Sequence, residues 1–93
     1  MFVGVLVIEI LIYSSTSLKE KRMVLKSVKD RLKNKFNVAV AEIGFQDKWQ
    51  RAQLGIATIS NQHSHLEHSL QQIFEYLDHS DSYEIISYEF TYV

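Results

Sequence analysis

Basic side chains are the groups in this chain best suited to binding chemistry, because they all occur in one stretch of the sequence. The ten lysines and arginines lie between Lys19 and Arg51, a window that holds only four acidic residues. The window therefore sums to 10 − 4 = +6, while the flanks hold the other 11 − 4 = 7 acids and sum to −7. A net charge of −1 hides this division, which predicts one basic face able to attract phosphate.

Five of these cations recur at helical spacing, with steps of 3, 4, 3 and 4 residues. At ~100° per residue they fall inside an arc of about 80° on one helix. Lysine faces exposed to water are common, but a predicted second helix at residues 63–78 carries no lysine or arginine at all. This contrast favours a surface that binds the backbone of structured RNA. We call the five residues the basic ridge: Lys19, Arg22, Lys26, Lys29 and Lys33.

A second polar group precedes the third predicted strand. Lys48 and Arg51 are expected to extend the RNA-binding surface, and Asp47, Trp49 and Gln50 to bind a ligand or form an interface. A tryptophan that fills the end of the sheet is the alternative structural explanation.

Other candidate sites are weaker. His65 and His68 lie one helical turn apart, but no carboxylate or cysteine completes a metal-binding set, so we expect no metal. Residues 14–17 are four hydroxyl residues at the start of the first helix, where an anion could bind near Arg22. Hydroxyls at this place are usually helix caps, so phosphate chemistry is only an alternative. We expect no enzyme activity, no catalytic residue and no cofactor.

Tyr88, Phe90 and Tyr92 alternate onto one side of the last predicted strand. Exposed rings on a sheet can stack on unpaired bases. Here the alternation matches Ile86, so we expect these rings to pack against the helices or at an edge.

The hydrophobic periodicity predicts six elements in the order βαββαβ. This order is typical of the ferredoxin-like fold, an α+β sandwich in which two helices cover one face of a four-stranded antiparallel sheet. Residues 1–93 would form one domain, with the first and third strands in the middle. The predicted strands are 2–13, 37–43, 50–60 and 83–92, and the helices are 17–35 and 63–78.

The first predicted strand is apolar on both sides, apart from Glu9. Because the helices can cover only one face, we expect a homodimer or higher homo-oligomer through the open sheet face. A monomer whose loops fold back over that face is the alternative.

The first helix should begin with a capping box, in which Ser17 accepts from the Glu20 amide and Glu20 reaches back to Ser17. Glu20 and Asp30 lie off the basic ridge. The residues expected to pack on the sheet are Leu18, Leu25, Val28, Leu32 and Phe36.

Composition limits the class of protein. The chain is 46% hydrophobic and has no cysteine, which excludes disulfides and zinc–thiolate sites. The apolar amino terminus has no basic residues ahead of it and is interrupted at Glu9, so we expect a cytoplasmic protein with no membrane span.

Three stretches, SLKEKR at 17–22, FNVAVAE at 36–42 and DxWQRAxLG at 47–55, closely resemble the YlxP-like family of small bacterial proteins of unknown function. The likeness covers nearly the whole chain. It implies a ferredoxin-like fold and, because members are often encoded near translation factors, work on RNA or the ribosome. It implies no catalytic role for any residue. The matching motif positions are Lys19, Lys21, Arg22, Phe36, Asn37, Glu42, Asp47, Trp49, Gln50 and Arg51.

The sequence therefore predicts a non-enzymatic domain that binds RNA or a ribosomal surface through the basic ridge and the segment from Lys48 to Arg51. The alternative is a homo-oligomeric regulatory domain that binds a small anionic ligand at the subunit interface, near Trp49 and Arg51.

Overall fold

A computed structural model describes all residues from 1 to 93. It confirms the six predicted elements, with bounds that differ by at most two residues. They are β1 (Phe2–Leu11), α1 (Leu18–Lys35), β2 (Ala39–Gly44), β3 (Arg51–Ser60), α2 (His63–Leu77) and β4 (Glu84–Tyr92).

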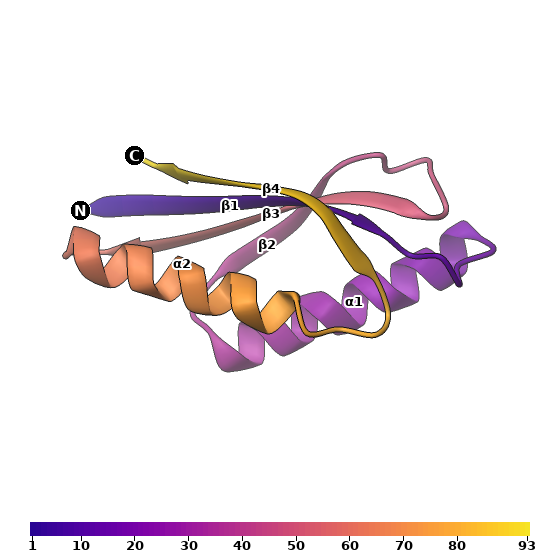
Figure 1. Ribbon diagram of the computed structural model, residues 1–93, viewed down its shortest axis with the longest axis horizontal. Coiled ribbons are helices and arrows are strands. Elements are labelled where there is room, and N and C mark those ends of the chain that lie inside the picture. Colours follow the sequence, from indigo (N-terminus) through magenta and orange to yellow (C-terminus); the bar gives the residue numbers. More distant parts are fainter.

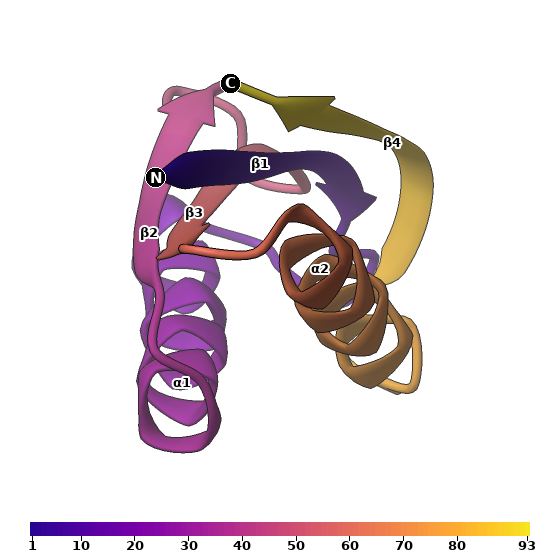
Figure 2. The same ribbon diagram turned by 90° about the vertical axis from the view of Figure 1, so that its left-hand side faces the viewer.

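The four strands form one sheet in the order β2-β3-β1-β4, and every neighbouring pair is antiparallel. Both helices lie on the same face of the sheet, α1 below β2 and α2 below β1, and they run in opposite directions (Figure 1 and Figure 2). This arrangement confirms the ferredoxin-like α+β fold, with β1 and β3 in the middle. Neither helix is long and apolar enough to cross a membrane.

The core fills the space between the sheet and the helices. Alternate residues of β1 point into it, as the period of two requires, and all of these except Gly4 carry a large side chain. A Cβ at Gly4 would lie 2.7 Å from Leu70 Cδ1, so the missing side chain lets α2 approach the sheet closely. The fully buried residues include Leu6, Ile8 and Ile10 of β1, Ile12 just after this strand, Leu32 of α1, Leu54 and Ile56 of β3, and Leu66 and Leu70 of α2.

The opposite sheet face is open and apolar. Strand register places Val5 beside Ala57, Val7 beside Gly55, and Gly55 beside Ala41 of β2. These residues are half-buried or exposed. The open face is therefore made largely of small and branched apolar side chains along β1 and the neighbouring parts of β2 and β3, as the pattern of β1 predicts, with polar side chains at Glu9, Gln53 and Glu89.

The aromatic residues of β4 face the helices. Tyr88 pairs with Ile8, and Phe90 pairs with Leu6, both on the core side, and Phe74 of α2 lies 4.4 Å from the Tyr88 ring. The expectation of edge packing is confirmed. The expected match with Ile86 is wrong, because the register shifts between Ile85 and Ser87 so that Ile85 pairs with Ile10. A strand irregularity thus moves Ile86 out of the core position.

The start of α1 differs from the predicted capping box in one contact. Ser17 Oγ accepts from the Glu20 amide at 3.1 Å, as expected. Glu20 instead accepts from Thr16, from its amide at 3.1 Å and its hydroxyl at 2.6 Å. These hydrogen bonds stabilise the carboxylate and lower the pKa of Glu20. Ser15, which is buried, donates to the Ser17 carbonyl.

Candidate nucleic-acid interface

The basic ridge lies on the flank of α1 that borders edge strand β2. Together with Leu25, Asp30 and Glu42, four of its residues line a shallow groove of about 340 Å³. The ridge residues are exposed except for Lys29, which is half-buried. The groove members from the ridge are Arg22, Lys26, Lys29 and Lys33, and Lys19 is exposed at the start of the helix.

One ridge cation is already paired. Lys26 Nζ donates to Asp30 Oδ2 at 2.8 Å, so the expectation that Asp30 lies apart from the ridge is wrong. The two residues are spaced i and i+4, which brings their side chains together on a helix. This hydrogen bond raises the pKa of Lys26 and lowers the pKa of Asp30. The other four ridge cations make no ion pair, so they keep their charge available to a ligand.

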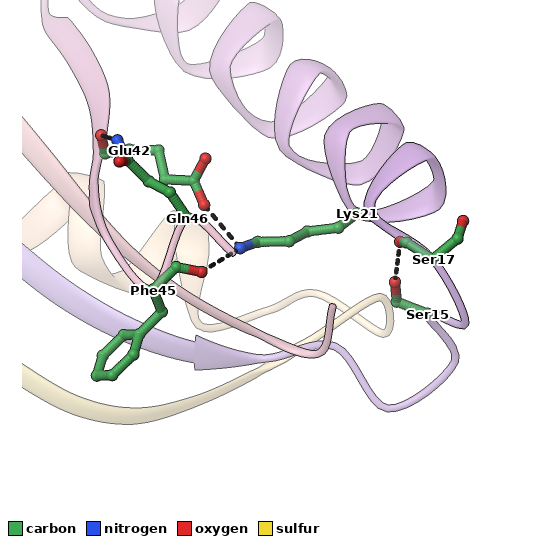
Figure 3. Close-up of polar contacts among 6 residues, drawn as sticks. All are labelled: Ser15, Ser17, Lys21, Glu42, Phe45 and Gln46. Carbon is green, nitrogen blue, oxygen red and sulfur yellow. Dashed lines mark hydrogen bonds and ion pairs between the residues drawn. The ribbon is translucent and has the colours of Figure 1, made fainter. Parts of the chain in front are cut away.

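Lys21 is the one lysine of α1 whose side chain is buried. Its side chain is 1% exposed, and its Nζ lies 2.8 Å from Glu42 Oε2 and donates to the Phe45 carbonyl at 2.7 Å (Figure 3). Glu42 Oε2 has no hydrogen-bond partner, so the Lys21–Glu42 contact is an ion pair at a short distance without hydrogen-bond alignment. The sequence carried a signal for this burial, because at ~100° per residue Lys21 falls between Val28 and Leu32 within the apolar arc of α1.

Phe45 turns the chain at the end of β2. It adopts a left-handed backbone conformation with φ of 58°, which costs a non-glycine residue about 1 kcal/mol. In this conformation its carbonyl accepts both from Lys21 and from the Lys48 amide, at 3.0 Å. Gln46 donates to the Glu42 carbonyl at 3.2 Å (Figure 3). These contacts bind the β2–β3 loop to α1, and they fix the position of the basic ridge relative to edge strand β2.

Comparison with known proteins agrees with this geometry. Residues 3–90 match the family described as "Protein of unknown function (DUF503)". The chain is a member of the DUF503 family. A relative from Bacillus subtilis (strain 168), "Uncharacterized protein YlxP", is 49% identical over 70 residues, which cover 75% of this chain and 76% of the relative. The predicted resemblance to a YlxP-like family of unknown function is confirmed.

Several motif positions of this DUF503 chain hold the β2–β3 loop in place. Gln50 donates through Nε2 to the carbonyls of Tyr13 and Ser15, at 3.1 and 3.0 Å, and its own carbonyl accepts from the Ile12 amide. Gln50 therefore ties the loop to the segment before α1. We therefore interpret Gln50 as a residue that positions the loop and not as a ligand contact.

Trp49 is 56% exposed, so it is not a buried residue that fills the end of the sheet. It lines an open hollow of about 450 Å³ formed by residues 45 and 47–51, which include Asp47 and Lys48. Lys48 is exposed and makes no ion pair. The structure thus gathers the second polar group of the sequence around one shallow site.

Arg51 of this DUF503 chain is not placed with the ridge. Its strand partner is Leu11, on the open sheet face opposite the helices. Its Nη2 lies 2.8 Å from Glu9 Oε2, and its guanidinium lies over the Phe45 ring at 4.2 Å from the centroid. Its charge is therefore matched, and it faces away from the helix layer.

The histidines do not form a group of metal ligands. His63 Nδ1 lies 2.6 Å from Glu67 Oε1, and the imidazole packs between the rings of Phe2 and Tyr92. His65 and His68 are exposed. His63 thus joins both ends of the chain to the start of α2.

Proposed function

We propose that this DUF503 protein binds RNA or a ribosomal surface through the basic ridge, without catalysing a reaction. The observation that carries the proposal is the set of four unpaired cations, Lys19, Arg22, Lys29 and Lys33, on one flank of α1. From Lys19 to Lys33 the ridge extends about 21 Å, at 1.5 Å per residue. A straight row of cations of this length suits a phosphate backbone better than a small ion.

The expected interaction depends steeply on salt. If four phosphates are contacted, log K falls with log salt at a slope of about −2.8 to −3.6. Affinity should then decrease roughly 50- to 150-fold between about 50 and 200 mM salt. Because these contacts read charge and shape, base substitutions that preserve the RNA helix should change affinity little.

Fluorescence anisotropy with a labelled RNA hairpin, and pelleting with purified ribosomal subunits, would test this proposal. In Lys29→Gln/Lys33→Gln we expect weaker binding and a salt slope shallower by about 1.5. Arg31→Gln/Lys35→Gln is the matched control, since it removes two charges from the same helix on the opposite flank. Equal losses in the two variants, or binding that salt does not weaken, would refute the ridge as the site.

The native protein offers a second test. In a cell lysate fractionated on a sucrose gradient, the protein should migrate with ribosomal particles at low salt and move to the top of the gradient as salt is added. Migration as free protein at every salt concentration would contradict an association with ribosomes.

We also propose that a second copy of this chain covers the open sheet face. Ten residues at about 3.3 Å and four strands at about 4.8 Å give a face of roughly 600 Å² per protomer. Two such faces would bury roughly 1,200 Å², which reaches the lower end of stable protein interfaces. Small residues such as Ala41, Gly55 and Ala57 let two sheets approach closely.

The alternative of a small anionic ligand near Trp49 has less support. The hollow there has a suitable size, but Glu9 already matches the charge of Arg51. The hydroxyls of Ser15, Thr16 and Ser17 are likewise engaged at the start of α1, which argues against phosphate chemistry in that loop.

A further inference from the structure

Two cations of α1 lie outside the basic ridge and remain without a carboxylate partner. Arg31 and Lys35 are exposed and make no ion pair. At ~100° per residue they lie about 160° around the helix from the centre of the ridge. They therefore face the side of α1 that is turned toward α2.

A groove of about 620 Å³ runs between the carboxyl-terminal halves of the two helices, beside the segment that leads into β4. Its size is within the range of small-molecule sites, and its wall combines apolar and aromatic side chains. Phe36 and Tyr76 meet edge to face with ring centroids 5.7 Å apart, and Val28, Leu77 and Tyr83 complete the apolar lining.

The basic groups of the groove are held in place. Arg31 donates through Nε and Nη2 to Ser27 Oγ, at 3.2 and 2.9 Å, which orients the guanidinium and leaves Nη1 without a hydrogen bond inside the protein. Lys35 Nζ lies 5.1 Å from the centroid of the Tyr76 ring. The fork of an arginine next to a lysine is a recurrent way of binding phosphate.

The remaining polar groups are largely committed to the fold. Tyr83 donates to the Leu77 carbonyl at 2.7 Å, and burial raises the pKa of Tyr83 to about 12, so it stays neutral. His79 Nδ1 contacts the Glu75 carbonyl, which can only accept, so Nδ1 carries the proton. Apart from His79, the charged residues Arg31, Lys35 and Glu75 give the lining a formal charge of 2 − 1 = +1.

We infer that this groove binds a small phosphate-bearing molecule with a planar ring, of the nucleoside monophosphate class. The phosphate lies against Arg31 and Lys35, and the ring lies along the aromatic wall at Tyr76. The Glu75 carboxylate accepts from a sugar hydroxyl or a ring amino group. The site goes beyond the proposed RNA surface, because it lies on the opposite flank of α1 and uses none of the ridge residues.

Nuclear magnetic resonance titration of the ¹⁵N-labelled protein with AMP, GMP, CMP and UMP would test the inference. We expect at least one of them to give saturable amide shifts at Lys35, Tyr76 and Ser80. The corresponding nucleoside, which lacks the phosphate, should bind about tenfold more weakly or worse. Arg31→Gln/Lys35→Gln should lower the affinity about tenfold, while Lys29→Gln/Lys33→Gln should stay within about twofold of the wild type.

Three outcomes would overturn the inference. They are the absence of saturable shifts with all four nucleotides up to about 10 mM, shifts confined to the ridge, and equal losses in the two double variants. Arg31, Lys33 and Lys35 are exposed and Lys29 is half-buried, and the dispersion of the spectra will show whether both variants are folded. The RNA experiment uses the same pair of variants in the reverse roles, which separates failure of one proposal from failure of the other.

Discussion

Replacement of Lys21 by methionine provides the sharpest test of how the structure holds its ridge-bearing helix. Methionine keeps the apolar stem and removes the ammonium group. The Glu42 carboxylate, which is 18% exposed, would lose its counter-charge, and the Phe45 carbonyl would keep only the Lys48 amide as donor.

The size of the effect follows from burial. Breaking a buried ion pair costs about 3–5 kcal/mol, and the partial exposure of Glu42 allows water to recover some of that. We therefore expect Lys21→Met to lower the free energy of unfolding by about 2–3 kcal/mol. For a domain of this size, that corresponds to a decrease in Tm of roughly 10–20 °C.

Urea unfolding followed by far-ultraviolet circular dichroism would measure this loss. Lys21→Met/Glu42→Leu should be more stable than Lys21→Met by about 1–2 kcal/mol, because no unpaired charge remains. Lys19→Met, an exposed change on the same helical turn, should stay within about 0.5 kcal/mol of the wild type. The reasoning fails if Lys21→Met is as stable as this control, or if the effects of the two substitutions at 21 and 42 simply add.

Three further predictions concern the core, the start of α1 and the open face. Gly4→Ala should destabilise the protein by about 1–3 kcal/mol in the same urea assay, because the new Cβ would meet the buried Leu70 side chain; an unchanged midpoint would contradict the close approach of α2. Because the pKa of Glu20 is lowered in the folded state, its contribution to the free energy of unfolding is complete above the ordinary carboxyl pKa of 4.5 and disappears as the pH falls through the lower folded value. The difference in stability between the wild type and Glu20→Gln should therefore shrink in acid and not in base. Light scattering should give the wild type twice the 10.9 kDa protomer mass and Ala41→Lys the single mass; a monomeric wild type would refute the sheet-face dimer.

The fold could be predicted from local patterns because each element carries a clear one. The alternation in β1 and the apolar arc of α1 set which sides of these elements are buried. The same periodicity, in segments with few glycines and no proline, predicts the order of the elements. Where prediction failed, a local irregularity decided the outcome. Ile86 was misplaced because a register shift in β4 cannot be read from the residue types around it.

The candidate site was predictable only where it depended on one helix. The arc of the ridge follows from spacing alone, and the same calculation would have revealed Lys21, whose charge hid its position in the apolar arc. Its partner Glu42 comes from another element, so its identity required the strand order. The pairing of Arg51 with Glu9 and the groove beside Arg31 likewise depend on how separate elements are stacked.

The placement of both helices on one side of the sheet has a consequence for the proposed dimer. Two protomers joined through their open faces would form four layers, with the helices outermost and the two copies of α1 roughly 30 Å apart across three interlayer spacings of about 10 Å. Each α1 would then meet its own stretch of polyanion, so that one assembly could bridge two RNA segments. Such bridging multiplies modest individual affinities into strong avidity only where the two segments are held at a matching separation.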